Sequence, residues 1–261
     1  MDLECPAPRE RIVLLKVPLD IVPPERLADA VYDALNSVEI HGEGRNIVLL
    51  SLWDLLRARR NSEYRAFIER AALVIPISKS LVGGARFLTG KTPARYMPFD
   101  FVIRLLTALE TREFSAYLLG AKSRVLQRAE KNVRQTFPHL RIVGRYIGGF
   151  KKQDEAAILE AIRKAAPSLL LVGKGIRGEE FWIARNHRRL SRGLRLWCSD
   201  LFEVFAEKKQ RPPDAIFDRG LEWIGFCFQK PLRLFRIFPY FYYKLLLVLY
   251  RLFKRESTEA A

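Results

Sequence analysis

The chain alternates short apolar runs with helix-length amphipathic segments, and this alternation limits its possible folds more than any other feature. The apolar runs are of strand length, are rich in Val, Ile or Leu, and fall at 11–17, 46–52, 72–77, 114–120, 140–144, 168–173 and 194–198. Segments with apolar residues three and four apart lie between them, including 24–37, 54–71, 100–111, 123–136, 153–166 and 178–192. The pattern predicts an α/β fold, Rossmann-like, with a mostly parallel sheet flanked by helices. Ligands of such sheets bind at the carboxyl ends of the strands, so we expect functional residues directly after each run.

The C-terminal segment differs from this pattern. Residues 219–255 contain eight Lys or Arg, a single acid and eleven aromatic residues. On a helical wheel the basic residues fall within an arc of roughly 100°: Arg233, Arg236, Lys244, Arg251, Lys254 and Arg255. A basic stripe beside a broad apolar face predicts an amphipathic helix at the headgroup level of a membrane.

We therefore divide the chain into an α/β core, 1–207, and a membrane-associating helical appendage, 208–261. Four cations of the appendage are predicted to bind the anionic membrane: Lys244, Arg251, Lys254 and Arg255. Pro239 is expected to break or kink the helix. The apolar stretch is too interrupted for a membrane span. The alternative is an ordinary amphipathic helix packed on the core or on a partner subunit.

The net charge of +16 indicates a partner that carries negative charge, either nucleic acid, an anionic membrane or a phosphorylated substrate. The densest basic run outside the tail, 184–195, has no nucleic-acid motif beside it, so we expect a solvated helix face and no nucleic-acid partner. The three cysteines and three histidines stand apart, which predicts neither a disulfide framework nor a metal site. The charged N-terminus does not fit a signal peptide, so we expect a cytoplasmic protein on the inner face of the cell membrane.

The segment GKGIRG imitates a dinucleotide-binding fingerprint, with Gly173, Gly175 and Gly178 after an apolar run and Asp200 about twenty residues later. The fingerprint normally opens a nucleotide-binding unit, whereas too little α/β chain follows here to build one. A tight turn between strand and helix is the preferred interpretation.

A different resemblance covers far more of the chain. VGKGIRGEEFWI (172–183) resembles the V-G-x-G-x-P-x-Q-E-x-W-I motif of the WecG/TagA/CpsF glycosyltransferases, family 26. LEWIGFCFQKPLRLFR (221–236) is similar to that family's G-L-E-W and E-P-x-R-x-x-R signature. Four further blocks keep the order of the family's motifs along the chain: RYMPFD (95–100), YLLGAKSRVLQRAE (117–130), FPHLRIVGRYIGGF (137–150) and KKQRPP (208–213).

The resemblance implies inverting transfer of an N-acetylmannosamine-type or related sugar from a UDP donor to a polyprenyl-diphosphate-linked acceptor, in cell-surface glycan synthesis. It implies that the donor diphosphate is bound by Arg211, Arg233 and Arg236. Arginine suits diphosphate because its planar guanidinium makes bidentate contacts. Since the chain has no D-x-D motif, we expect no metal or other cofactor. The glycines of the matching motifs are predicted to bind the nucleotide sugar: Gly120, Gly148, Gly149, Gly173 and Gly175.

The departures from the family pattern concern catalysis. Where the family has P-D-G, with the Asp expected to act as general base, this chain has Pro76-Ile77-Ser78. Other differences are 49–51 in place of T-x-N, Arg177 in place of a proline, Glu179-Glu180 in place of Q-E, and Phe202-Glu203 in place of F-D. Loss of a positioned base typically costs about 10²–10⁴ in rate. Either another carboxylate serves, with Asp100, Glu179 and Glu180 as candidates, or the acceptor differs, or the protein is a non-catalytic relative that binds sugar nucleotide or lipid-linked glycan.

Overall fold

The structure is a computed structural model that describes residues 10–190, 192–210, 217 and 237–259, with the side chains of 41, 237 and 254–259 excepted. The three arginines predicted to bind the donor diphosphate, Arg211, Arg233 and Arg236, lie outside the described residues.

A six-stranded parallel sheet forms the centre of the molecule, in the order β4-β3-β8-β7-β5-β6. Its strands are β3 (Arg45–Leu50), β4 (Leu73–Pro76), β5 (Ser115–Leu119), β6 (Arg141–Tyr146), β7 (Leu169–Val172) and β8 (Leu194–Trp197). The chain builds the β3–β4 edge, crosses to β5 and β6, and returns through β7 to β8 in the middle. The predicted α/β fold with a mostly parallel sheet is confirmed.

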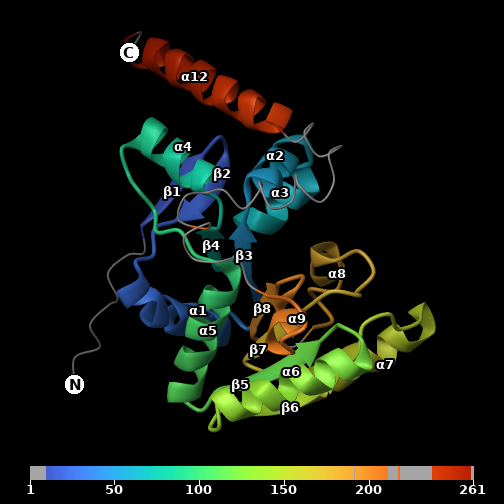
Figure 1. The fold of residues 1–261 in the computed structure, drawn as a ribbon. Helices are drawn as coiled ribbons and strands as arrows, with labels where there is room; N and C mark the ends of the chain where they lie inside the picture. The colour runs from blue at the N-terminus through green and yellow to red at the C-terminus, as the bar shows by residue number, and fades with distance from the viewer. Residues whose placement is uncertain (1–9, 191, 211–216, 218–236, 260–261) are drawn as a thin grey trace.

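Helices cover both faces of the sheet (Figure 1). One face packs against α1 (Leu27–His41), α5 (Pro98–Thr111), α6 (Ser123–Thr136) and α9 (Leu201–Phe205). The other packs against α2 (Leu52–Arg60), α3 (Ser62–Glu69), α7 (Glu155–Ala165) and α8 (Glu180–Arg185). Two short 3₁₀ helices, η1 (Pro24–Arg26) and η2 (Lys152–Asp154), lead into α1 and α7. Because both faces are covered, β4, β5 and β7 are apolar on both sides, which is why they appear in the sequence as continuous apolar runs, whereas the edge strand β6 is mostly exposed.

The first apolar run, 11–17, does not join this sheet. It forms β1 (Arg11–Leu14) and the start of β2 (Val17–Asp20), an antiparallel pair of its own. The turn between them has positive φ at Leu15 and Lys16, 50° and 71°. Such values usually occur at Gly or Asn, so the sequence carried no signal for this hairpin.

A buried carboxylate fastens the hairpin to the sheet. The Nε of Arg11 donates to Oδ1 of Asp20 at 2.7 Å, and the backbone N–H of Val74 in β4 donates to Oδ2 of Asp20 at 2.7 Å. The contacts satisfy the carboxylate, whose burial alone would be costly.

Two predicted helices are shorter than expected. The segment 54–71 is divided between α2 and α3 because the side chain of Asn61 accepts a hydrogen bond from the N–H of Tyr64 at 2.9 Å and so begins a new helix. In the segment 178–192, the described residues form only the six-residue helix α8. Gly175 and Gly178 both have positive φ, 94° and 89°, which confirms the tight turn predicted for GKGIRG.

The C-terminal helix α12 (Ile237–Glu259) lies across the top of the molecule beside α4 (Lys79–Thr89) (Figure 1). Tyr243 and Leu247 are buried against α4, and the hydroxyl of Tyr243 donates to the carbonyl oxygen of Ser80 at 3.1 Å. A Cβ on Gly84 would lie 1.9 Å from the Tyr243 oxygen, so only glycine leaves room for this contact. Pro239 causes no break, because it falls in the first turn of α12, where a helix tolerates proline.

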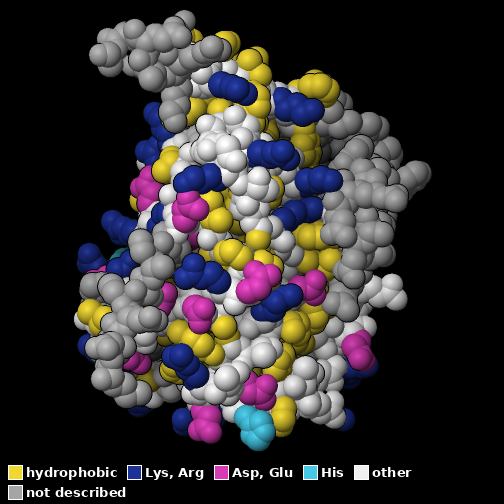
Figure 2. Space-filling model, turned by 90° about the vertical axis from the view of Figure 1, so that its left-hand side faces the viewer, with side chains coloured by type: hydrophobic (Ala, Val, Ile, Leu, Met, Phe, Trp, Pro, Cys, Tyr) yellow, Lys and Arg dark blue, Asp and Glu magenta, His cyan; other side chains and the backbone are white. Residues whose placement is uncertain are grey.

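The opposite side of α12 is exposed and largely apolar. Its exposed residues include Phe238, Phe241, Tyr242, Leu245, Val248, Leu249, Tyr250, Leu252 and Phe253. Lys244 and Arg251 are exposed among them, while the side chains of Lys254 and Arg255 are not described. Figure 2 shows Lys and Arg side chains gathered over the upper part of the face that it presents, with acidic side chains more frequent lower down. Within the described residues, no helix is both long and apolar enough for a membrane span.

Candidate functional site

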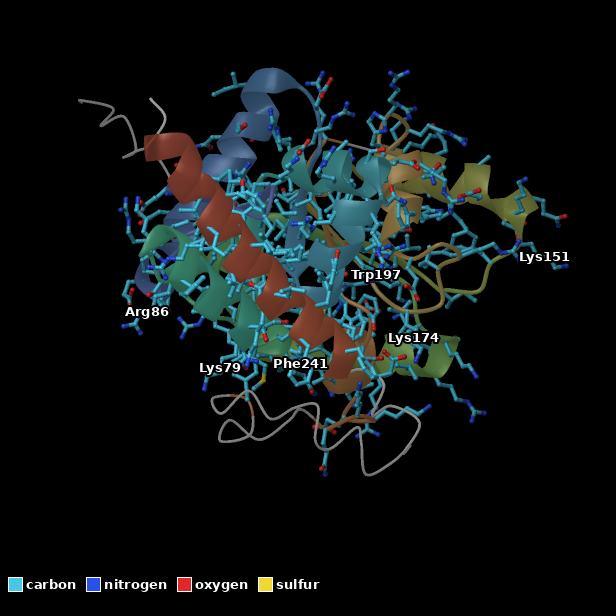
Figure 3. The ribbon with its side chains drawn as sticks, turned by 90° about the horizontal axis from the view of Figure 1, so that it is seen from above. Lys79, Arg86, Lys151, Lys174, Trp197 and Phe241 are labelled. Atoms are coloured by element: carbon cyan, nitrogen blue, oxygen red, sulfur yellow. The ribbon has the colours of Figure 1, made fainter. Side chains whose placement is uncertain are left out.

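A cavity of about 1000 Å³ opens at the carboxyl ends of β3, β4 and β8. Ser51, Ser78 and Cys198, which follow these three strands, line it. The helix α12 contributes Tyr240, Phe241 and Lys244 to the same lining. Figure 3 shows Lys79 and Phe241 together near the N-terminal end of α12. The position agrees with the rule that parallel sheets bind ligands at their carboxyl edge.

One wall of the cavity is a capped helix start. The Oγ of Ser51 accepts from the N–H of Asp54 at 3.3 Å, and the N–H of Ser51 donates to Oδ2 of Asp54 at 2.9 Å. This capping box begins α2. The hydroxyl of Tyr64 in α3 donates to the other oxygen of Asp54 at 3.3 Å. The box therefore holds a carboxylate rigidly at the cavity.

An ion pair between the exposed Arg57 and the buried Glu180 stands beside this wall. Nη1 of Arg57 donates to Oε1 of Glu180 at 2.5 Å, and its guanidinium packs against the rings of Tyr64 and Phe181, 4.6 and 4.4 Å from their centroids. The stacking restrains the arginine, and the arginine in turn orients Glu180. Glu180 comes from α8 and Arg57 from α2, so the pair joins two segments 123 residues apart.

Burial changes the pKa of two side chains in this wall, Glu180 and Tyr64. It raises the pKa of Glu180 above its ordinary value, and the nearby charges of Asp54 and Glu179 raise it further, although Arg57 opposes the shift. Burial is also the main reason that the pKa of Tyr64 is raised. A carboxylate with a raised pKa is a stronger base and is the form expected of a general base near neutral pH.

Among the described residues, five cations from separate parts of the chain also line the cavity: Lys79, Arg95, Arg195, Lys209 and Lys244. Arg195 is buried in β8, and burial lowers its pKa to about 10. Three carboxylates line the cavity as well, on Asp54, Glu180 and Asp200. An excess of cations suits an anionic ligand such as a diphosphate, whereas the buried carboxylate suits proton transfer.

The loop after β8 carries a carboxylate, that of Asp200, which lies beside two lysines. Asp200 pairs with Lys209 and lies 3.8 Å from Nζ of Lys174. Before it, burial raises the pKa of the Cys198 thiol to about 12. Since the thiolate is the nucleophilic form, burial disfavours the reactive state of Cys198.

The loop that replaces the family's P-D-G also faces the cavity. Ile77 and Ser78 both line it. The Oγ of Ser78 accepts from the N–H of Leu52 at 3.1 Å, so it caps α2, and Nε of Arg95 donates to the carbonyl oxygen of Ile77 at 2.9 Å. The cavity thus contains an apolar side chain and a hydroxyl at the place where the resemblance implies an acid.

The structure separates the three predicted catalytic carboxylates. Glu180 lines the cavity. Glu179 is exposed at the start of α8, and Asp100 is half-buried in the first turn of α5; neither is among the described residues that line the cavity. Sequence reasoning missed Asp54 and Asp200. A signal for Asp54 was present, because Ser51-x-x-Asp54 directly after an apolar run has the form of a capping box.

The five predicted glycines lie together and contact one another through the backbone, although Gly173 also packs against the ring of Phe202. The N–H of Gly149 donates to the carbonyl oxygen of Gly175 at 2.6 Å, and that of Gly148 to Ala121 at 2.8 Å. A Cβ on Gly120 would lie 2.8 Å from the carbonyl oxygen of Gly173. The turns after β5, β6 and β7 thus pack backbone against backbone. None of the five lines the cavity, and their role in nucleotide-sugar binding stays a prediction.

Metal binding was not expected, and within the described residues no group of three or more His, Cys, Asp or Glu side chains is placed to hold an ion. The predicted membrane residues Lys244 and Arg251 are both exposed on α12, and Lys244 also lines the cavity.

The fold and cavity define a Rossmann-like protein that presents buried acid and clustered cations at the carboxyl edge of its sheet. The chain belongs to the glycosyl transferase WecG/TagA/CpsF family, whose model matches residues 12–260.

Two relatives with assigned activities are distant in sequence. A Bacillus spizizenii protein named N-acetylglucosaminyldiphosphoundecaprenol N-acetyl-beta-D-mannosaminyltransferase is 23% identical over 176 residues, which cover 67% of this chain and 68% of that protein. A Staphylococcus aureus protein of the same name is 22% identical over 190 residues, or 72% of this chain and 74% of the relative.

Proposed function

We propose that this protein transfers an N-acetylmannosamine-type or related hexosyl unit from a UDP-sugar to a polyprenyl-diphosphate-linked acceptor, as part of cell-surface glycan synthesis. Family membership supports glycosyl transfer, and the names of the two relatives support this sugar and this acceptor. The observation that carries the proposal is the cavity, where Glu180, a buried carboxylate with a raised pKa, stands among cations.

In the proposed reaction Glu180 is the general base. The acceptor hydroxyl gives its proton to the Glu180 carboxylate while its oxygen bonds to the anomeric carbon of the donor. The bond from that carbon to the UDP oxygen breaks, and UDP leaves with the electron pair, so the configuration inverts. Arg57 acts as a positioning residue, because it holds Oε1 of Glu180 at 2.5 Å.

UDP carries negative charge that must be stabilised as it leaves. We assign this role to Arg95, Arg195 and Lys209 of the cavity, together with Arg211, Arg233 and Arg236, which the family resemblance implies. The chain between Gln210 and Ile237 connects two cavity-lining regions, α9's loop and α12. The described residues Gln210 and Tyr240, on the two sides of the segment that carries these arginines, both line the cavity.

We also propose that α12 docks on an anionic membrane, as the appendage of an α/β core. Its exposed apolar side chains are mixed with Lys244 and Arg251, and Lys254 and Arg255 follow on the same helix. Each basic residue near an anionic surface contributes about 1 kcal/mol, and the apolar side chains add burial at the interface.

A non-catalytic role is the second candidate function. Ile77 and Ser78 face the cavity where the family pattern places an acid. A protein with this cavity but no working base would bind a sugar nucleotide or lipid-linked glycan without turning it over.

Substitution of the candidate carboxylates tests the proposal. Glu180→Gln should lower the transfer rate by about 10²–10⁴, because the base is lost. Glu179→Gln is the matched control, since it removes the same charge from an adjacent, exposed position; Asp100→Asn is a second. Transfer from UDP-N-acetylmannosamine to a lipid-linked acceptor would be followed by release of UDP.

Full activity of the Glu180→Gln protein would exclude Glu180 as the base. If the unmodified protein binds UDP but transfers no sugar, the non-catalytic candidate is supported. In that case Ile77→Asp, which restores the family's residue, is the informative variant, because a gain of activity would show that the substrate site is intact.

A further inference from the structure

The helices α4 and α12 lie side by side and run in the same direction. Tyr243 near the start of α12 bonds to Ser80 near the start of α4, and further along the guanidinium of Arg251 lies 4.5 Å from the ring centroid of Phe87. The arrangement brings cations of the two helices to corresponding positions along the pair.

Each helix presents two cations seven residues apart, which places them on one face, two turns from each other. They are Lys79 and Arg86 on α4, and Lys244 and Arg251 on α12. The lysines of both helices line the cavity, whereas the arginines of both helices line a second, shallower groove between them. Figure 3 shows Lys79 close to Phe241, with Arg86 further along α4.

An apolar stripe extends from the cavity along α12. Phe241, Leu245, Val248 and Leu252 are spaced by four, three and four residues, which places them on one face of the helix. Their exposed fractions are 66%, 56%, 48% and 56%. Phe241 lines the cavity as well. The stripe therefore begins at the cavity mouth and continues outward for roughly 16 Å, at 1.5 Å per residue.

We infer that Lys79 and Lys244 bind the diphosphate of a polyprenyl-diphosphate ligand whose hydrocarbon chain lies along the stripe Phe241, Leu245, Val248 and Leu252. The inference rests on the proposed function, because that ligand is the carrier of the proposed acceptor. Two ammonium groups match the charge of a diphosphate, and the stripe matches a linear hydrocarbon. The ligand needs both features in one place, and the cavity mouth provides them where α4 meets α12.

Binding to the full chain can be measured without turnover, because Trp53 and Trp197 line the cavity and report on it by fluorescence. The probes are farnesyl diphosphate, farnesol, inorganic pyrophosphate and UDP. Farnesyl diphosphate should bind more tightly than farnesol or pyrophosphate. The double variant Lys79→Gln/Lys244→Gln should weaken its binding by about tenfold or more, as charge-assisted hydrogen bonds are lost, and should change UDP binding by less than about twofold.

The matched control is Arg86→Gln/Arg251→Gln, which removes the same charge from the same two helices two turns away. It should leave farnesyl diphosphate binding within about twofold. Leu245→Ser/Val248→Ser should weaken the binding of farnesyl diphosphate, because apolar contact is lost. It should leave the binding of pyrophosphate unchanged. All three double variants change exposed side chains, and circular dichroism melts would verify their folding.

Unchanged farnesyl diphosphate binding in the lysine variant would overturn the inference, as would equal loss in the arginine control. A loss of UDP binding alone would assign the lysines to the donor and would also overturn it. If the unmodified protein transfers no sugar, yet its binding of farnesyl diphosphate depends on the two lysines, only the proposed function fails. If it transfers sugar and the lysine variant keeps its KM for the lipid acceptor, only this inference fails.

Discussion

The two halves of the sheet's carboxyl edge are built differently. The turns after β5, β6 and β7 contain glycines and pack backbone against backbone, with N–H to carbonyl bonds between them. The segments after β3, β4 and β8 carry side chains and surround a cavity of about 1000 Å³. One half is closed and rigid, while the other is open and chemically varied.

The difference follows from how the chain winds. Because β8 returns to the middle of the sheet, between β3 and β7, the connections on its two sides lead away in different directions. A crevice forms at such a point in open α/β sheets. In the closed half, backbone contacts between glycines fill the space at the ends of the strands. In the open half, acidic and basic side chains line the cavity instead.

Gly120→Ala should have the largest effect on stability, because it disrupts the closed half in two ways. Gly120 has φ of 130°, and an added Cβ would lie 2.8 Å from the carbonyl oxygen of Gly173. Backbone strain and overpacking together should cost about 2–6 kcal/mol of unfolding free energy. Denaturant unfolding would measure it.

The control for that experiment is Gly83→Ala. Gly83 lies in the exposed part of α4 with open space around it, and alanine there should stabilise the protein by up to about 1 kcal/mol. A loss below about 1 kcal/mol for Gly120→Ala, well under the strain and overpacking costs combined, would show that the closed half is less rigid than we describe.

Gly84→Ala should have an intermediate effect, at the mouth of the open half. Its Cβ would meet the hydroxyl of Tyr243, so α12 must move away from α4. Overpacking should cost about 1–3 kcal/mol, offset in part by roughly 1 kcal/mol of helix propensity. Limited proteolysis should release α12 faster than in the Gly83→Ala protein. Equal rates would mean that this contact does not hold the helix.

The pH dependence of stability should reveal the smallest effect, within the open half. The pKa of Glu180 is raised in the folded protein. Between its ordinary pKa and the raised value, the folded state binds a proton that the unfolded state does not. Rising pH in this window should therefore destabilise the unmodified protein relative to Glu180→Gln.

Thermal melts of both proteins across the acidic to neutral range would measure this difference. The Tm of Glu180→Gln minus that of the unmodified protein should increase with pH and then level off above the folded pKa. A difference that decreases with pH would mean that Arg57 stabilises the ionised form more than burial opposes it.

Much of the fold could be predicted from local patterns. Continuous apolar runs indicated buried parallel strands, and their alternation with amphipathic segments indicated the crossover helices. The prediction of a single strand over 11–17 was wrong, because the chain turns at Leu15 and Lys16, which have positive φ, and forms a hairpin. The division at Asn61 was missed because its cap looks like one more polar residue within a helical pattern.

The site was only partly predictable. The family resemblance named Glu180, which lines the cavity; the loss of an acid at Ile77, which the resemblance also implied, stays a prediction. Asp54 was missed because its capping function conceals it as an ordinary helix start, and the ion pair of Arg57 with Glu180 joins residues that are 123 positions apart. Such pairs arise only when two helices meet.

The sequence by itself determined the α/β class, the family and the amphipathic character of the C-terminal helix, because periodicity and local motifs depend on neighbours along the chain. Only the tertiary structure decided which carboxylate enters the cavity and which face of α12 is covered. Glu179 and Glu180 are adjacent and chemically equivalent, yet one is exposed and the other buried. The physical reason is that burial and charge pairing depend on packing between distant segments, as where Gly84 admits Tyr243.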